Sequence, residues 1–341
     1  MTHSHGPCTD TMSDNNLPTI FDPTTCSRKG LCPVTSIRNK GDPFESHSLY
    51  YEQHGTGPTK VVFIMGLNST SFAWSPQVEY FGRKPEYSVL VFDNRGVGNS
   101  GVPRGPYTTS GMAEDAIALL DYIGWKETHS IHVVGVSLGG MIAQELATRI
   151  PERIISLTLA VTTAGGRPWA NFPPRKGLIN LTRLMAITDA EKKIPLVHDM
   201  VFPESWLDEV AEGDTEGRTN REHMTIEYRK RIEATRPQTF LGSVSQMAAG
   251  LTHNVSAERL RNISKSIPKV TIVTGDQDHL VDPSNSKYLK ENMPEAELQV
   301  WEETGHGIHM QRKRRFNELL EKTFTECSER VAKLGEVSET P

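Results

Sequence analysis

The sequence predicts an α/β fold in which a mostly parallel sheet is flanked by helices on both faces. Short apolar runs rich in β-branched residues alternate with stretches whose apolar residues recur at helical spacing. Nearly continuous apolar runs are typical of parallel strands that are buried on both faces. Their alternation with helices implies right-handed crossover connections within one sheet. The predicted strands are Lys60–Met65, Ser88–Phe92, Ile131–Val134, Ile154–Val161, Val270–Val273 and Glu297–Trp301.

Two helices of this alternation have clear end signals. The first is expected to end at Gly124, and the second is expected to stop at Pro151. Glycine is common just beyond a helix end because it adopts the left-handed conformation readily, and proline cannot continue a helix. In each helix the apolar residues share one face, which is expected to pack on the sheet. These residues are Met112, Ala116, Leu119, Leu120 and Ile123 in the first helix, and Ile142, Leu146 and Ile150 in the second.

The alternation breaks between about Gly166 and Ser266, where the sequence reads as helices and loops. An insertion after a strand is expected to form a cap over the carboxyl ends of the strands, where α/β folds bind ligands. The alternative is an ordinary excursion over the surface. We therefore expect a helical cap at residues 167–266. The helices predicted within it are Leu178–Ile187, Glu222–Ala234 and Gln238–Ala249.

The rest of the chain is expected to divide into an α/β core and two polar ends. The core is predicted to comprise residues 46–166 and 267–326. Residues 1–45 are polar, contain several prolines and show no sustained periodicity, so we expect a flexible leader that lies over the surface. Residues 327–341 are expected to form a polar tail.

Composition and charge argue against several classes of protein. The chain has 341 residues, with 37 Lys and Arg against 42 Asp and Glu, so its formal net charge is −5. A mildly acidic total argues against a nucleic-acid binder that works by bulk electrostatics. No stretch approaches the ~20 apolar residues needed to span a bilayer, and the N-terminus lacks the apolar core of a signal peptide. The cysteines form no close CxxC pair, and we expect reduced thiols in a cytoplasmic protein. They are Cys8, Cys26, Cys32 and Cys327.

The most informative motif is Gly-Val-Ser-Leu-Gly-Gly at residues 135–140, directly after one predicted strand and at the start of a helix. A strand that turns abruptly into a helix holds the residue at the apex in a strained conformation. Bulky neighbours two positions away would collide, so Ser137 has Gly135 and Gly139 on its two sides. The turn exposes the serine hydroxyl, and the unpaired N–H groups of the helix N-terminus can bind an anion. Ser137 is therefore the candidate nucleophile.

A serine hydroxyl is a poor nucleophile and needs a base, which in turn needs an orienting carboxylate. Among the histidines, His306 lies on a glycine-flanked loop directly after the last predicted strand. His309 is the nearest alternative, but we expect it within the start of the next helix. His132 lies inside a strand and His279 neighbours the acid loop, so both are expected to be structural. A metal site built on His306 and His309 lacks further ligands at suitable spacing.

Two carboxylates could orient this histidine. Asp276 and Asp278 both follow the strand Val270–Val273 and a glycine, and either could be aimed at the imidazole. The residues alone favour Asp278 and leave Asp276 open. Asp282 lies further along the loop and is predicted to be the N-cap of the next helix.

These motifs resemble the α/β-hydrolase superfamily, and the resemblance covers nearly all of residues 46–325. The order Ser137, Asp278, His306 matches that family's order of nucleophile, acid and histidine. In the family, the acid usually falls three positions after the glycine that ends its strand. The resemblance therefore implies Asp278 rather than Asp276. The helical insertion corresponds to the family's variable cap.

Two further segments take part in the resemblance. Phe92–Ser100 is similar to the family's D-x-R-G-x-G-x-S segment, which we interpret as a loop-shaping element rather than a catalytic one. The resemblance also implies that the main-chain N–H groups of Leu67 and Leu138 form the oxyanion hole. The family commonly carries His-Gly after the early strand, whereas this chain has Met65-Gly66. Because the donor is a main-chain amide, the absence of the imidazole need not remove the function.

The sequence therefore predicts a serine hydrolase that cleaves a carboxylic ester or related acyl substrate through an acyl-enzyme intermediate, with no metal or organic cofactor. A serine nucleophile argues against haloalkane or epoxide hydrolysis, because an alkylated serine would be a stable ether. An acyltransferase or a C–C bond hydrolase could use the same triad, and a ligand-binding protein with little turnover could use the same fold. The expected partner is a small-molecule substrate with an apolar part, without nucleic acid.

Overall fold

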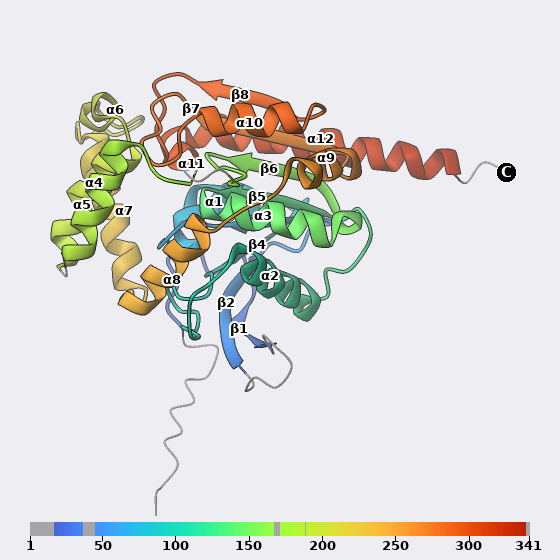
Figure 1. The fold of residues 1–341 in the computed structure, drawn as a ribbon, viewed down its shortest axis with the longest axis horizontal. Coiled ribbons are helices and arrows are strands. Elements are labelled where there is room, and N and C mark those ends of the chain that lie inside the picture. Colours follow the sequence, from blue (N-terminus) through green and yellow to red (C-terminus); the bar gives the residue numbers. More distant parts are fainter. Residues whose placement is uncertain (1–16, 37–44, 167–170, 188, 339–341) are drawn as a thin grey trace, which may run out of the picture.

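The computed structural model describes residues 17–36, 45–166, 171–187 and 189–338. In these residues, eight strands form one sheet in the order β1-β2-β4-β3-β5-β6-β7-β8 (Figure 1). The six strands from β4 to β8 along this order are parallel, whereas β2 pairs antiparallel with both β1 and β4. The strands are β1 (Cys26–Ser36), β2 (Glu45–His54), β3 (Thr59–Ile64), β4 (Tyr87–Phe92), β5 (Ile131–Val136), β6 (Ile154–Ala160), β7 (Lys269–Gly275) and β8 (Glu297–Trp301).

The six strands predicted from apolar runs are confirmed as the parallel part of the sheet. Every residue of β4, β5 and β6 is buried, as expected for strands that are covered on both faces. Alternate side chains serve two separate cores. In β3, Val62 and Ile64 belong to one core, and Val61 and Phe63 belong to the other.

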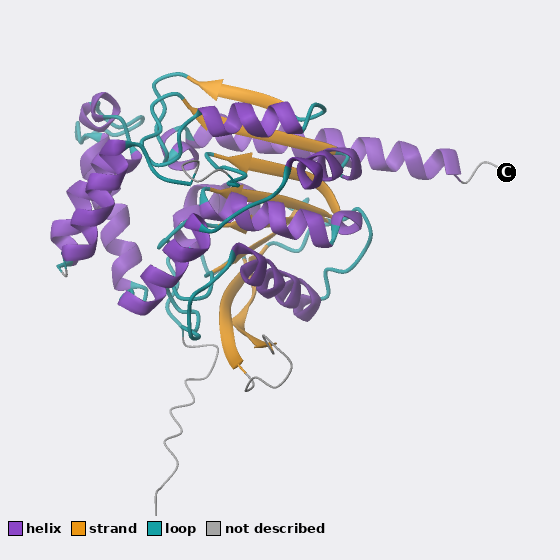
Figure 2. Cartoon of the chain, in the orientation of Figure 1, coloured by secondary structure: helices purple, strands orange, loops and turns teal. Residues whose placement is uncertain are grey.

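Helices cover both faces of the sheet (Figure 2). Residues of α2, α3, α9 and α10 pack into one core, and residues of α1 and α12 pack into the other. The helix α2 ends at Gly124 as predicted, where the glycine adopts φ 87°, and its start is capped by Thr108, which accepts a hydrogen bond from the Gly111 amide. Together with the short α11, whose Ile308 packs into the second core, the helices of these layers are α1 (Ser75–Gly82), α2 (Thr109–Ile123), α3 (Leu138–Arg149), α9 (Ala257–Ser266), α10 (Ser284–Asn292), α11 (Ile308–Gln311) and α12 (Lys313–Ser338).

Part of the segment expected to be a flexible leader is instead the edge of the sheet. The strand β1 pairs with β2 from Cys26 to Ser36, so the core begins well before residue 46. The strand is hard to recognise because Pro33 interrupts it, although proline is tolerated at a sheet edge. Its side chains nevertheless alternate, with Cys32 and Val34 buried. Residues 1–16 and 37–44 of the expected leader lie outside the described residues.

The insertion between β6 and β7 is helical, as predicted, and five of its described helices lie at one end of the sheet, the end to which the arrowhead of β8 points (Figure 1). The helices α5 and α6 were not predicted, and Pro195 inside α5 explains why that pattern was obscured. Residues 167–170 and 188 lie outside the described residues. The five helices are α4 (Arg175–Ala186), α5 (Ala190–Val201), α6 (Glu204–Asp208), α7 (Asn220–Glu233) and α8 (Phe240–Leu251).

Two predicted boundaries need correction. The expected cap extended to residue 266, but α9 packs against α3 and α10 in the layer that covers the sheet, where it buries Leu260 and Ile263. The expected polar tail began at residue 327, but α12 continues to Ser338 and Cys327 is fully buried. Cys327 continues the helical spacing of the buried Phe324, which the polar composition around it conceals. Among the described helices, α12 included, none combines the length and apolar character that a membrane span requires.

Candidate active site

The predicted nucleophile lies at a sharp turn between β5 and α3. Ser137 has φ 57° and ψ −122°, a conformation that costs a residue with a side chain about 1–3 kcal/mol. Hydrogen bonds to residues at the end of β6 and just after it hold it there. The Ser137 amide donates to the Ala160 carbonyl at 3.0 Å, and the Ser137 carbonyl accepts from Thr162 Oγ1 at 2.7 Å. The turn leaves Ser137 only half-buried at the carboxyl edge of the sheet.

The glycines on either side of this serine are required by close main-chain contacts. A Cβ atom on Gly135 would lie 2.4 Å from the Gly139 carbonyl oxygen. A Cβ atom on Gly139 would lie 2.0 Å from the carbonyl oxygen of Ile64, at the end of β3. The sequence predicted collisions within the turn. The structure adds that the second glycine also makes room for the neighbouring strand.

The structure joins His306 to Asp278. Nδ1 of His306 lies 2.8 Å from Oδ2 of Asp278, and because a carboxylate can only accept, the imidazole donates in this bond. The other carboxylate oxygen, Oδ1, accepts from the amides of Leu280 at 2.8 Å and Val281 at 2.9 Å. The Asp278 side chain is fully buried. The carboxylate is therefore fixed in position, and it orients the imidazole through one oxygen only.

The alternative acids occupy different positions. Asp276 is exposed, and its Oδ1 accepts from the Thr304 amide at 3.2 Å, which ties the loop after β7 to the loop after β8. Asp282 accepts from the Ser284 amide at 2.8 Å, but it lies one residue before the N-cap of α10, which is Pro283 and not Asp282 as predicted. Of these carboxylates, Asp278 alone has a hydrogen bond to His306 among the described residues.

The alternative bases are all in positions that favour the neutral imidazole. His309 packs against Trp74 with ring centroids 4.8 Å apart, and burial, followed by the charges of Arg231 and His306, lowers its pKa to about 3. Burial lowers the pKa of His132 in β5 to about 3. His279 is half-buried, and burial lowers its pKa as well. Within the described residues, no group of three or more His, Cys, Asp or Glu side chains could hold a metal ion.

The loop after β3 lies directly against the serine. A Cβ atom on Gly66 would lie 3.0 Å from Cβ of Ser137, so a side chain here would require the serine turn to shift by a small amount. The next amide, that of Leu67, has no hydrogen-bond acceptor among the described residues. Leu138 is the first residue of α3, so its N–H has no partner within the helix. Two amides that have no acceptor in the described part of the chain therefore flank the turn that carries Ser137.

The segment Phe92–Ser100 supports these loops through a buried carboxylate. Asp93 accepts from the amides of Ser71 at 2.7 Å and Asn99 at 2.8 Å. Burial raises the pKa of Asp93 to about 6, although these two hydrogen bonds oppose the shift. Arg95 forms a two-pronged ion pair with the buried Asp115. These contacts fit a loop-shaping role for the segment.

Residues of the helical insertion complete the surroundings, and among them Gln246 was not predicted from the sequence. Gln246 of α8 reaches the loop after β3 through the Asn68 amide at 2.8 Å. Phe202 follows α5 and lies against Gly307, where a Cβ atom would be 2.3 Å from the Phe202 ring. The sequence offers four aromatic residues that could line an apolar pocket: Trp74, Trp169, Phe172 and Phe202. In the structure Phe202 is beside the histidine loop, Phe172 is exposed, Trp74 is buried in the core, and Trp169 lies outside the described residues.

The arrangement leaves one contact unmade. No hydrogen bond joins Ser137 to His306 within the described part of the chain. The two residues follow β5 and β8, whose carboxyl ends lie at the same edge of the sheet because both strands are parallel to those between them. In the absence of substrate, such catalytic contacts are often long.

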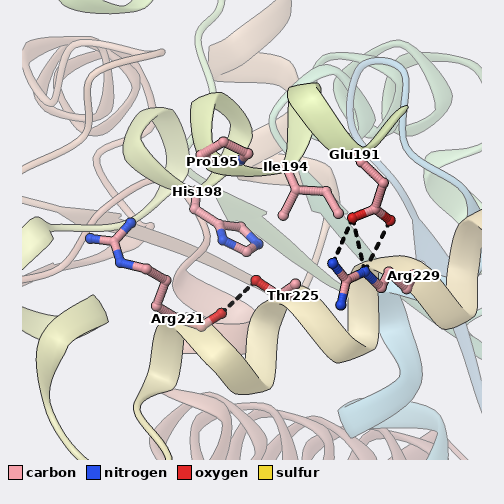
Figure 3. Close-up of a pocket in the computed structure, with 7 residues that line it drawn as sticks. All are labelled: Glu191, Ile194, Pro195, His198, Arg221, Thr225 and Arg229. Atoms are coloured by element: carbon pink, nitrogen blue, oxygen red, sulfur yellow. Dashed lines mark hydrogen bonds and ion pairs between the residues drawn. The ribbon is translucent and has the colours of Figure 1, made fainter. Parts of the chain in front are cut away.

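A cavity of about 150 Å³ lies elsewhere, between α5 and α7 (Figure 3). It contains none of the predicted site residues. The ion pair between Arg229 and Glu191 lies at its rim, and His198 points toward α7. Burial lowers the pKa of His198 to about 4, helped by the charge of Arg221. The candidate active site is therefore at the strand ends and not in this cavity.

Comparison with known proteins agrees with the fold. The family model of the alpha/beta hydrolase fold matches residues 59–313. A protein of Azorhizobium caulinodans named "Putative carbamate hydrolase RutD" is 29% identical over 274 residues, which cover 80% of this chain and 93% of that protein. A poly(3-hydroxyalkanoate) depolymerase of Ectopseudomonas oleovorans is 40% identical over 100 residues, which cover 27% of this chain and 34% of the relative.

Solved structures resemble this one over most of its length. An esterase from Thermogutta terrifontis has a TM-score of 0.67 and 21% identity, covering 88% of this chain and 99% of that one. An enol-lactonase from Burkholderia xenovorans LB400 has a TM-score of 0.65 and 19% identity, covering 82% and 97%. At these identities the likeness concerns the fold alone. Because the family model spans most of the sequence, the chain belongs to the α/β-hydrolase family.

Proposed function

We propose that this α/β-hydrolase cleaves a carboxylic ester or a related acyl substrate, with Ser137 as nucleophile, His306 as general base and Asp278 as the residue that orients it. The observation that carries the proposal is the buried Asp278–His306 hydrogen bond of 2.8 Å, at the sheet edge that also bears the strained Ser137. Triad chemistry requires an imidazole held in one tautomer, with its second nitrogen directed to the nucleophile.

The reaction follows from these roles. Nε2 of His306 takes the proton of Ser137 as the serine oxygen attacks the substrate carbonyl carbon. The N–H groups of Leu67 and Leu138 bind the oxyanion of the tetrahedral intermediate. Its collapse breaks the acyl bond, and the leaving alcohol takes the proton from His306. Water then attacks the acyl-enzyme with His306 as base, which releases the acid and restores Ser137.

The relatives and the residues around the site support an acyl substrate with an apolar part. The names of the related proteins include a carbamate hydrolase, an esterase and an enol-lactonase, whose substrates all contain a carbonyl group. Phe202, packed against the histidine loop, and Leu138, next to the serine, are buried apolar neighbours of the site. A small molecule with an apolar acyl or alcohol group is compatible with these apolar surroundings.

Labelling with a fluorophosphonate, which phosphonylates an activated serine, tests the proposal. We expect the wild type to be labelled at Ser137 and the Ser137→Ala variant to remain unlabelled. A panel of p-nitrophenyl esters of increasing chain length should show turnover that this variant loses by a factor on the order of 10⁶. Product analysis with added alcohols or thiols separates hydrolysis from acyl transfer. Equal labelling of both proteins would refute the assignment of Ser137.

A further inference from the structure

The loop that carries the Leu67 amide lacks the histidine common in this family, so other groups must hold it. Two buried side chains do so. Nδ2 of Asn94 donates to the Met65 carbonyl at 2.8 Å. The Asn68 amide donates to Oε1 of Gln246 at 2.8 Å. The first bond comes from the loop after β4, and the second comes from α8 of the helical insertion.

These two bonds act on the peptide units on either side of the Gly66–Leu67 unit, which carries the proposed oxyanion donor. A peptide unit is planar, so a bond to either its carbonyl or its N–H fixes the orientation of the whole unit. Asn94 fixes the unit between Met65 and Gly66, and Gln246 fixes the unit between Leu67 and Asn68. The unit between them carries the Leu67 N–H, which has no acceptor in the described residues. Its orientation is therefore set from both sides while its donor stays free.

Gln246 is itself held firmly. Its side chain is fully buried, and Nε2 donates to the Arg95 carbonyl at 2.8 Å while Oε1 accepts from Asn68. The amide thus bridges the loop after β3 and the loop after β4. Because both ends of the amide are engaged, its orientation cannot reverse without leaving the Asn68 amide and the buried Arg95 carbonyl unpaired.

The rest of α8 is packed closely on the same loops. Nδ2 of Asn68 donates to Ser243 Oγ at 2.8 Å. A Cβ atom on Gly242 would lie 2.2 Å from the Gly96 carbonyl oxygen, so α8 and the loop after β4 are in direct main-chain contact. Asn68 also has φ 52°, a conformation that asparagine tolerates better than most residues. The position of Gln246 is therefore fixed by several contacts.

We propose that Gln246 is a positioning residue for the oxyanion hole, which makes the Leu67 donor depend on a helix of the insertion. The inference rests on the proposed function, because it assigns the Leu67 amide to the oxyanion. Gln246 acts through the main chain and stabilises the transition state more than the bound substrate. Its loss should therefore lower kcat and leave KM nearly unchanged.

The test is Gln246→Met, which keeps the length of the side chain and removes both hydrogen bonds. We expect kcat/KM and the rate of fluorophosphonate labelling to fall by about 10–100-fold, less than the 10²–10³-fold for complete loss of a donor, since Leu67 retains its N–H. The inhibition constant of a trifluoromethyl ketone, which forms a tetrahedral oxyanion on serine, should rise by the same factor.

The matched control is Gln77→Met. Gln77 is also fully buried, and its Nε2 donates to the His309 carbonyl and to Asn317 Oδ1, both at 3.0 Å. Each variant loses two hydrogen bonds of a fully buried glutamine, so a merely structural effect would lower stability and activity alike in both. We expect a similar fall in Tm and a loss of labelling rate only in Gln246→Met.

The outcomes separate this inference from the proposed function. If the wild type is labelled at Ser137 and Gln246→Met reacts at the same rate, the positioning role is refuted and the proposed function stands. If the wild type is not labelled, both are refuted. Should Gln246→Met fail to fold, Gln246→Asn provides the second variant, because its side chain is one methylene shorter and cannot reach both the Asn68 amide and the Arg95 carbonyl. A labelling rate equal to that of the wild type would refute the inference there too.

Discussion

Replacing Asp278 by asparagine tests the proposed triad most directly. Oδ1 of Asp278 accepts from two main-chain amides, so in the variant only the side-chain oxygen can occupy that position. The new NH₂ group must then face Nδ1 of His306, which lies 2.8 Å from Oδ2 in the structure. Two donors cannot share this contact, so the imidazole has to accept at Nδ1 and carry its proton on Nε2. That nitrogen can no longer take a proton from Ser137.

The expected loss is large because the variant holds the imidazole in the wrong tautomer. Reversal of the tautomer lowers kcat on the order of 10⁴-fold in serine triads, which corresponds to about 5 kcal/mol of transition-state stabilisation. The two main-chain bonds to the side chain remain, so Tm should change little. Initial rates on a p-nitrophenyl ester and thermal unfolding of the same samples measure both effects.

Asp276→Asn is the matched control. This side chain is exposed, and its amide oxygen can keep the bond to the Thr304 amide. We expect its rate to stay within about twofold of the wild type, as is usual for surface substitutions that keep their contacts. A Asp278→Asn variant within tenfold of the wild type, or an equal loss in Asp276→Asn, would show that the orienting acid has been misassigned.

Two further predictions concern stability. Gly139→Ala should prevent normal folding, because its Cβ atom would lie 2.0 Å from the Ile64 carbonyl oxygen. Gly124→Ala has open space, so its free energy of unfolding should fall by only about 1–2 kcal/mol because of the positive φ. Urea unfolding of both variants measures the difference, and equal losses would contradict the packing argument. Burial lowers the pKa of His132 to about 3, so the folded protein resists a proton that the unfolded chain binds near pH 6.5. The contribution of His132 to the free energy of unfolding is therefore complete above about pH 6.5. It is lost as the pH falls toward 3, at a rate of up to about 1.4 kcal/mol per pH unit. His132→Gln should reduce that slope in unfolding experiments between pH 6.5 and 5, and an unchanged slope would exclude His132 as its source.

The sequence predicted what depends on local pattern. The parallel strands are continuous apolar runs because both faces are buried, and the turn at Ser137 is visible because its glycines lie two residues on either side. The β1–β2 ribbon was missed because β1 depends on pairing with a downstream strand and contains Pro33. Both features reflect how much information a short segment holds about its own structure.

In the candidate site, too, local patterns were predicted and contacts between distant segments were not. The residues left Asp276 and Asp278 open, because two carboxylates on one loop differ only in the direction that folding gives them. Burial and the two amide bonds of Asp278 distinguish them in the structure. Gln246 had no signal at all, since it contacts Asn68 from a distant part of the chain. Contacts of this kind become visible only when the insertion is placed on the core.

The contacts that hold Ser137 have a consequence for partial unfolding. Its strained conformation is secured by the Ala160 carbonyl and the Thr162 hydroxyl, which both belong to the end of the neighbouring strand β6 and the residues after it. A peptide copying only the serine turn would relax to an ordinary backbone conformation. The reactivity of Ser137 therefore depends on the contact between the ends of β5 and β6. In mild denaturant, labelling of Ser137 should be lost before the circular dichroism signal of the folded protein is lost.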